Sequence, residues 1–224
     1  MGSETRSFGE FFESWVDQHR TYLERLLLAH AEGSETLVQQ VLGHYQEYYD
    51  EKSRAAESDV LLMFSPPWFS SYERTLLWVA GFKPSMTFGL VKESVGEDLN
   101  EEQRERIAVV REETRRAERE IEQAMASVQE SVAAPTMCRL VKRVESLVDG
   151  EASDMENAIE RLKGALREVI RDTDGLRQRT GLRVLEVLSP VQKVRFLAGA
   201  SQFWLQSRRL GMERDGQLIR HLNE

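Results

Sequence analysis

Apolar side chains recur at three- and four-residue steps along most of the chain, which is the spacing of amphipathic α-helices. The longest such stripe, over residues 100–133, carries dense Glu and Arg on its other face and resembles a coiled-coil seam. Helices are predicted over residues 8–31, 35–57, 70–79, 86–93, 100–133, 137–148, 154–188 and 190–210. The pattern therefore predicts an all-α fold in which long antiparallel helices pack with short ones.

Capping residues indicate where two of these helices begin. Asn100 is followed three residues later by Gln103, and Ser189 by Gln192, so each pair can form a capping box. Pro190 suits the first helical position after Ser189. We expect both helices to start at these residues.

The ends of the pattern suggest how the domain is bounded. The stretch 150–153, which reads Gly-Glu-Ala-Ser, predicts a mobile loop. The pattern weakens after Gly211, and we expect a frayed tail over 212–224. The prediction is one helical domain over residues 1–224 with an ordered core over 8–211.

The stretch from Phe64 to Ser85 concentrates aromatic, proline and turn residues more than any other part of the chain. Its Pro-Pro pair disfavours helix immediately before Trp68. A short helix is predicted from Ser70 or Ser71 to Val79, ended by a glycine with a proline three residues beyond. We expect the long helices to pack around this aromatic turn.

The same stretch is the candidate ligand site. An aromatic pocket with a basic mouth would suit a carboxylate-bearing lipid or a flat ligand. A packed core with the two cations at its rim is the alternative, because aromatic clusters usually lie in cores. The candidate residues are Trp68, Arg74, Trp78, Phe82, Lys83 and Phe88.

Composition and charge narrow the class of protein. The chain has 224 residues and a formal net charge of −8 at pH 7. Nonspecific binding to nucleic acid needs a basic surface, so we expect no direct contact with nucleic acid. The single cysteine, Cys138, fits a reducing compartment. No apolar run approaches the roughly 18 residues of a membrane span. These features predict a protein of the nucleus, the cytoplasm or both.

The residues predict no catalytic, cofactor or metal site. Cys138 has no histidine near it in sequence to serve as the base that a nucleophile needs. Neither a Gly-rich phosphate loop nor a G-x-S-x-G elbow is present. Four histidines occur, none with a second ligand at the spacing of a metal motif: His19, His30, His44 and His221.

Three blocks of the sequence stand out, in chain order. The first block is FFESWVDQHRTYLERLL, over residues 11–27, and the second is Trp78-Val-Ala-Gly81-Phe-Lys83-Pro84-Ser85. The third block comprises Asp174, Leu176, Arg177, Thr180, Ser189, Pro190 and Gln192. Together they resemble the plant Delay of Germination domain, which also forms the C-terminal half of TGA-type bZIP transcription factors. The second block is similar to the family's Trp-hydrophobic-Gly-Gly-x-Arg-Pro-Ser signature, with Ala80 in place of the first glycine.

This resemblance implies a non-enzymatic regulator in seed dormancy, abscisic acid signalling and transcription regulation. Its expected partners are protein phosphatases of the abscisic acid pathway or transcription regulators. The domain begins within about ten residues of Met1. We therefore expect no bZIP segment and no direct reading of DNA. The exposed long helix would also allow a homodimer.

Two alternatives to this function stay open. One is a sensor that binds a small apolar ligand, similar to a fatty acid or haem, in the aromatic pocket. The other is a membrane-associated developmental factor similar to the pollen-aperture members of the family. Haem binding in the family is associated with histidines of the last helix, but residues 201–210 contain none and His221 lies beyond them. We therefore expect no haem and no other cofactor.

Overall fold

The computed structural model describes residues 7–29, 34–132 and 149–222 of the chain. Within these ranges every regular element is an α-helix or a short 3₁₀-helix, which confirms the predicted all-α fold. In chain order the elements are α1 (Phe8–Leu28), α2 (Ser34–Ser58), η1 (Leu61–Met63), α3 (Ser71–Thr75), α4 (Met86–Val95), η2 (Gly96–Asp98), α5 (Glu101–Val132), α7 (Asp149–Val187) and α8 (Pro190–Leu222).

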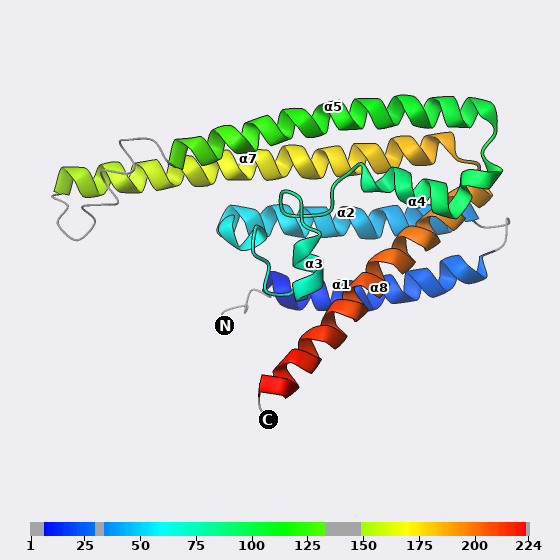
Figure 1. The fold of residues 1–224 in the computed structure, drawn as a ribbon, viewed down its shortest axis with the longest axis horizontal. Helices are drawn as coiled ribbons and strands as arrows, with labels where there is room; N and C mark the ends of the chain where they lie inside the picture. The colour runs from blue at the N-terminus through cyan, green and yellow to red at the C-terminus, as the bar shows by residue number, and fades with distance from the viewer. Residues whose placement is uncertain (1–6, 30–33, 133–148, 223–224) are drawn as a thin grey trace.

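The long helices form two groups: α5 packs with α7, and α1 packs with α2 and α8 (Figure 1). Helices α5 and α7 lie side by side and extend past the rest of the molecule. Helix α8 packs against α1, α3 and α4, and its C-terminal end projects from the body. The short helix α3 belongs to the stretch predicted to be the aromatic turn, and α4 follows that stretch directly; both pack against α8.

Buried apolar residues form three clusters. One joins α1, α2, α4, α5, α7 and α8 around Val41, Val91 and Val184. A second lies beneath the α5–α7 pair and includes Met63 and Ile170. The third is an aromatic cluster of Phe12, Trp15, Val16 and Phe69, with Trp68, Tyr45, Tyr48 and Trp204 packed on it.

Both predicted capping boxes are present. At the start of α5, Asn100 N donates to Gln103 Oε1 over 3.1 Å and Gln103 N donates to Asn100 Oδ1 over 2.9 Å. Before α8, Ser189 N donates to Gln192 Oε1 over 2.8 Å and Gln192 N donates to Ser189 Oγ over 3.4 Å. Since each box depends on two residues three positions apart, the local sequence specifies these helix starts.

The short helix predicted over 70–79 is wrong at its end. Helix α3 starts with a Ser70 capping box but stops at Thr75. Val79 and Ala80 then take left-handed backbone conformations, with φ of 45° and 58°. Trp78 N donates to the carbonyl of Gly81 over 2.6 Å, which closes a tight turn. Arg177 of α7 also holds this turn, by donating to the carbonyls of Trp78 and Val79.

Two boundary predictions are also wrong. The loop predicted at 150–153 is part of α7, which begins at Asp149. The tail predicted after Gly211 is helical as far as Leu222, because α8 continues and packs on α3. The expectation that the last helix contains no histidine is therefore also wrong, since His221 falls within α8. The helix predicted over 137–148, together with Cys138, lies outside the described residues. The extent of a single domain stays a prediction.

Candidate functional site

One arginine of α7 binds the carbonyl oxygens of the turn after α3. Arg177 Nε donates to the carbonyl of Phe82 over 2.7 Å. Its Nη2 donates to the carbonyls of Trp78 over 2.6 Å and Val79 over 2.9 Å. The guanidinium is always charged and presents a rigid fork of donors. Arg177 therefore holds the turn in the shape that interrupts the predicted helix.

Gly81 makes this close approach possible. A Cβ atom at Gly81 would lie 2.7 Å from Cζ of Arg177 and 3.0 Å from its Nε. Carbon atoms in proteins do not approach so closely, so any larger residue would displace the guanidinium. The family signature therefore has a glycine here because the Arg177 guanidinium leaves no room for a side chain. The positive φ values fall on the neighbouring Val79 and Ala80 instead, where side chains cost conformational energy.

A buried ion pair connects the same arginine to α2. Lys52 Nζ donates to Asp174 Oδ1 over 2.8 Å and to the carbonyl of Ala80 over 2.7 Å. Arg177 Nη1 donates to the same carboxylate oxygen over 2.5 Å. Burial lowers the pKa of Lys52 to about 8, although the attraction of Asp174 acts in the opposite direction. The network joins α2, α7 and the turn.

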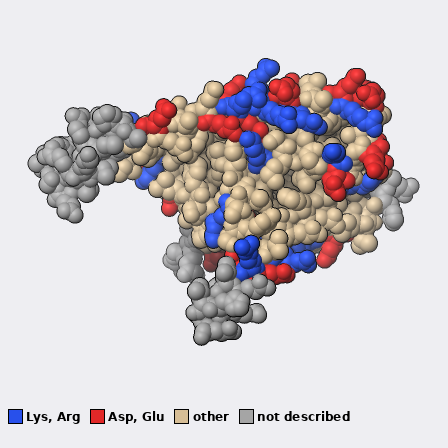
Figure 2. Space-filling model, viewed as in Figure 1, with Lys and Arg blue, Asp and Glu red and all other residues tan. Residues whose placement is uncertain are grey.

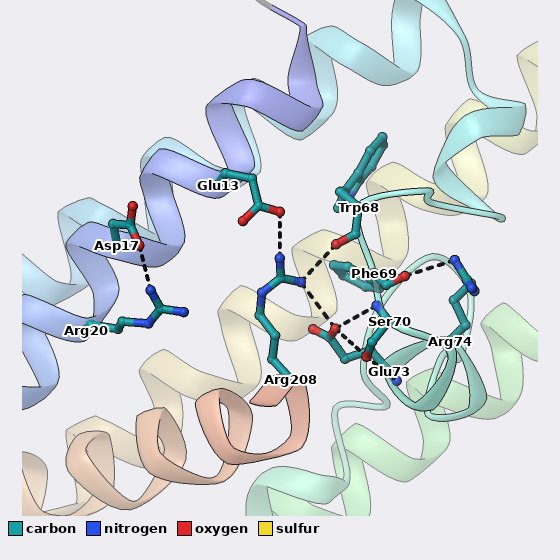
Figure 3. Close-up of polar contacts among 9 residues, drawn as sticks. All are labelled: Glu13, Asp17, Arg20, Trp68, Phe69, Ser70, Glu73, Arg74 and Arg208. Atoms are coloured by element: carbon teal, nitrogen blue, oxygen red, sulfur yellow. Dashed lines mark hydrogen bonds and ion pairs between the residues drawn. The ribbon is translucent and has the colours of Figure 1, made fainter. Parts of the chain in front are cut away.

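A second buried arginine connects α8 to α1 and α3 (Figure 3). Arg208 Nη1 donates to the carbonyl of Trp68 over 2.9 Å and to Glu73 Oε2 over 3.3 Å. Its Nη2 donates to Glu13 Oε1 over 2.6 Å, and its guanidinium lies 5.1 Å from the ring centroid of Phe12. Glu73 is 0% exposed. A carboxylate buried this completely needs the cation beside it.

Helix α3 is attached to the far part of α8 by further contacts. Ser71 N donates to Asp215 Oδ2 over 2.8 Å, and the Ser71 hydroxyl donates to the other carboxylate oxygen. These two bonds lower the pKa of Asp215. A Cβ atom at Gly211 would collide with Ser70, so the two helices are in close contact there. These contacts explain why α8 continues beyond residue 211.

A cavity of about 210 Å³ lies beside the Arg177 network, between α2, the turn, α7 and α8. Tyr48 and Tyr49 line it, and burial raises the pKa of both hydroxyls. A more open cleft of about 490 Å³ lies between α2, α7 and α8. The two spaces share the residues Tyr45, Tyr49, Thr87, Arg177 and Ala200. Together they provide an apolar space with charged groups at one side.

The structure brings together only part of the predicted pocket. Among the pocket and signature residues, Gly81, Phe82, Lys83 and Pro84 line the cavity, whereas Trp68, Arg74, Trp78 and Phe88 do not. Arg74 is exposed and donates to the carbonyl of Phe69 over 2.9 Å. The charged groups that do line the cavity are Lys52, Lys83, Asp174 and Arg177.

The remaining residues of the third block support helix contacts. The hydroxyls of Thr180 and Thr114 lie 3.2 Å apart between α7 and α5, and Leu176 is buried. Gln192 Nε2 donates to the carbonyl of Asp98 over 2.9 Å, which attaches η2 to α8. Pro190 is the first residue of α8.

Sequence reasoning missed Arg208 as a buried charge, and it placed only the stem of Lys52 in the buried stripe of the helix predicted over 35–57. Both occupy positions where the apolar stripe of their helix continues, which is the signal that could have found them. Their partners lie far away in sequence: Glu73 is 135 residues from Arg208, and Asp174 is 122 residues from Lys52. No local spacing predicts such pairs.

Two histidines lie stacked beside the aromatic cluster. The rings of His19 and His44 are 5.4 Å apart, and each stacks on Trp15, at 4.9 and 4.4 Å. Three of their four ring nitrogens have no hydrogen-bond partner in the structure: His19 Nδ1 and both of His44. Burial lowers the pKa of His19 to about 3, helped by His44, and that of His44 to about 4. Both are therefore neutral at pH 7.

Within the described residues, neither a metal-binding group of side chains nor a membrane-spanning helix is present. No three His, Cys, Asp or Glu side chains there are grouped to hold a metal ion. None of the helices there combines the length and the apolar character needed to cross a membrane.

The chain is thus an all-helical protein in which the charged side chains of Arg177 and Arg208 hold helices and the turn to one another. A family model described as "Seed dormancy control" matches residues 18–93. The chain is 38% identical over 222 residues to Protein ZW2 of Arabidopsis thaliana, covering 94% of this chain and 98% of that protein. It is also 38% identical over 226 residues to Protein RESPONSE TO ABA AND SALT 1 of the same plant, covering 95% and 98%.

A transcription factor is similar over most of the chain as well. Transcription factor TGA2.3 of Oryza sativa subsp. japonica is 29% identical over 208 residues, covering 90% of this chain and 63% of that protein. The chain belongs to the Delay of Germination family, which includes regions of TGA transcription factors.

Proposed function

We propose that this chain is a non-enzymatic regulatory protein of abscisic acid signalling and seed dormancy that acts by binding other proteins. The observation that carries the proposal is the use of its buried charges. Arg177 and Arg208 donate hydrogen bonds to backbone carbonyls and carboxylates of other helices and of the turn. Their charges therefore fix the arrangement of the helices, which is the role expected in a scaffold. Similarity over 95% of the chain to a protein named for its response to abscisic acid supports the pathway.

The surface supports docking of protein partners. Exposed Glu and Arg alternate over α5, and on the face drawn in Figure 2 the Lys and Arg atoms form a broken row over this helix with Asp and Glu atoms beside it. Charge patterns of this kind set specificity and association rate more than affinity. The TGA relatives are transcription factors, which supports a nuclear site of action.

Isothermal titration of purified proteins tests the proposal. The full chain is titrated with protein phosphatases of the abscisic acid pathway and with the C-terminal domain of a TGA factor. We expect at least one partner to bind with Kd of about 10 μM or tighter. A gel shift with duplex DNA should show no complex of this chain alone. If no such partner binds and DNA does, the proposal is wrong.

A second candidate function is a sensor of a small apolar ligand, favoured by the cavity and the neighbouring cleft that share lining residues. Their apolar walls could hold an alkyl chain, with Arg177 and Lys52 near its carboxylate. Native mass spectra of the purified chain, before and after incubation with a long-chain fatty acid, test this function. A bound mass that is released on denaturation, and that is reduced by Ala200→Trp, would support it. A bare chain under both conditions would exclude a retained ligand.

A further inference from the structure

The arginines of α5 lie on one edge of the helix. At about 100° per residue, positions 104, 111, 115 and 119 fall within about 80° of one another around the axis. We call Arg104, Arg111, Arg115 and Arg119 the arginine edge. Arg104 and Arg119 are fifteen positions apart, or roughly 22 Å along the helix. This local basic row is notable on a chain with a net charge of −8.

Carboxylates gather on another edge of the same helix. Glu102, Glu113 and Glu120 fall within about 20° of one another, on the far side of α5 from the arginine edge. Glu113 is paired with Arg183 of α7. The charges of α5 are not fully separated, because Arg106 and Arg116 lie nearer these carboxylates and Glu101 and Glu122 lie on the arginine side, but four arginines share one edge.

Part of the arginine edge is free to bind a ligand. Arg111 and Arg115 are exposed, and neither has a carboxylate within ion-pair distance among the residues that the structure describes. Arg111 lies 5.6 Å from the ring centroid of Phe88, which orients its side chain along the surface. Arg104 and Arg119 have only weak pairs, at 3.5 Å to Glu101 and 3.6 Å to Glu112. Such exposed pairs contribute little and can be exchanged.

The arginine edge continues into the turn. Glu122, which shares this side of α5, is neutralised by Lys83 Nζ at 2.7 Å and accepts a hydrogen bond from Trp78 Nε1 at 3.1 Å. Lys83 in turn lies 5.3 Å from the ring centroid of Trp78 and is 37% exposed. Arginine and tryptophan are the residue types enriched at the centres of protein interfaces.

We propose that the arginine edge binds an acidic segment of a partner protein, whose carboxylates meet Arg111 and Arg115. The proposal deepens the proposed function and rests on it. Carboxylates four residues apart on a partner helix have the same spacing as these two arginines, and each can accept the guanidinium fork with two bonds. Nucleic acid fits less well, because a duplex wider than the edge would place phosphates near the carboxylates of the same helix.

A peptide titration tests this surface. The probe is a fluorescein-labelled helical peptide of about 16 residues with Glu at every fourth position, compared with a Lys version. Fluorescence anisotropy measures its binding to the full chain at about 50 mM and 300 mM salt. We expect binding of the Glu peptide only, weakened by salt. Arg111→Glu with Arg115→Glu should reduce the affinity at least about tenfold.

The control pair changes the same charge elsewhere on the helix. Arg106→Glu with Arg116→Glu leaves the arginine edge intact, so we expect a change below about threefold. The single variant Arg115→Glu, with circular dichroism to verify folding, replaces the double variant if that one unfolds. Equal losses in both pairs would show a general field effect and overturn the proposal. No preference for the Glu peptide would also overturn it, as would tighter binding of labelled duplex DNA at this edge.

The two proposals fail in different ways. If the wild-type chain binds a phosphatase or TGA domain and the edge variants bind it equally well, the acidic-segment proposal fails and the proposed function stands. If the wild-type chain binds none of these proteins, the proposed function fails, while the peptide titration still decides whether the edge accepts carboxylates.

Discussion

Gly81→Ala is the substitution that most directly tests the role of Arg177. The new Cβ would lie 2.7 Å from Cζ of Arg177, and all three of its nearest atoms belong to that guanidinium. The backbone of Gly81 does not need a left-handed conformation, so backbone strain adds nothing. The effect must come from displacement of the arginine.

The expected loss of stability follows from the bonds that Arg177 makes. The guanidinium donates to three backbone carbonyls and to Asp174. A hydrogen bond to a charged group contributes about 1.5–3 kcal/mol, and breaking a buried ion network costs about 3–5 kcal/mol. Partial displacement should preserve some bonds. We therefore expect the free energy of unfolding to fall by about 3–4 kcal/mol.

Urea denaturation followed by circular dichroism measures this change, provided that the slope with urea stays constant. Gly164→Ala is the matched control in α7, because a Cβ there meets no atom within 4 Å. It should be neutral or stabilising by up to about 1 kcal/mol. The double variant decides the mechanism: with Arg177→Ala already present, Gly81→Ala should cost less than about 1 kcal/mol. If the stability losses of Gly81→Ala and Arg177→Ala add fully in the double variant, Gly81 does not act through Arg177 and our reasoning is wrong.

Three further outcomes are expected. Because the folded histidines His19 and His44 bind protons only near pH 3–4 and unfolded ones near 6.5, the unfolded state binds more protons between these values. Stability should therefore fall by about 2 kcal/mol per histidine from pH 8 to 5, and denaturation that is independent of pH would contradict this. Arg208→Met leaves Glu73 buried without its cation and should cost about 3–5 kcal/mol, partly restored by Glu73→Gln; a denaturation midpoint equal to wild type would argue against it. Ser71→Ala should speed amide hydrogen exchange in the last turns of α8 and leave α5 unchanged, and uniform exchange would mean that the contact is unimportant.

Local signals were sufficient for most of the fold. Apolar periodicity located the long helices, because burial of one face is a property of residues three and four positions apart. The capping boxes at Asn100 and Ser189 located two helix starts to the residue. The errors at 150–153 and after Gly211 arose where helix continues through a weak local pattern, and after Gly211 the helix is supported by contacts with Ser70 and Ser71.

The candidate site was only partly accessible to such reasoning. The family signatures identified Gly81, Asp174 and Arg177, but nothing in their spacing indicated that they touch. Arg177 and Phe82 are 95 residues apart, and Arg208 and Glu13 are 195 apart. Trp68 and Trp78 were expected to line a pocket, yet the cavity is lined by tyrosines of α2 instead.

A physical cause separates the features that the sequence alone predicts from those that only the packed structure decides. Helix type and helix starts depend on interactions within a few residues, so they can be inferred from the order of amino acids alone. The turn at Val79 and Ala80 is held against its own conformational preference by a guanidinium from α7. Such a conformation exists only once the helices have packed, because the energy that stabilises it comes from a contact between distant parts of the chain.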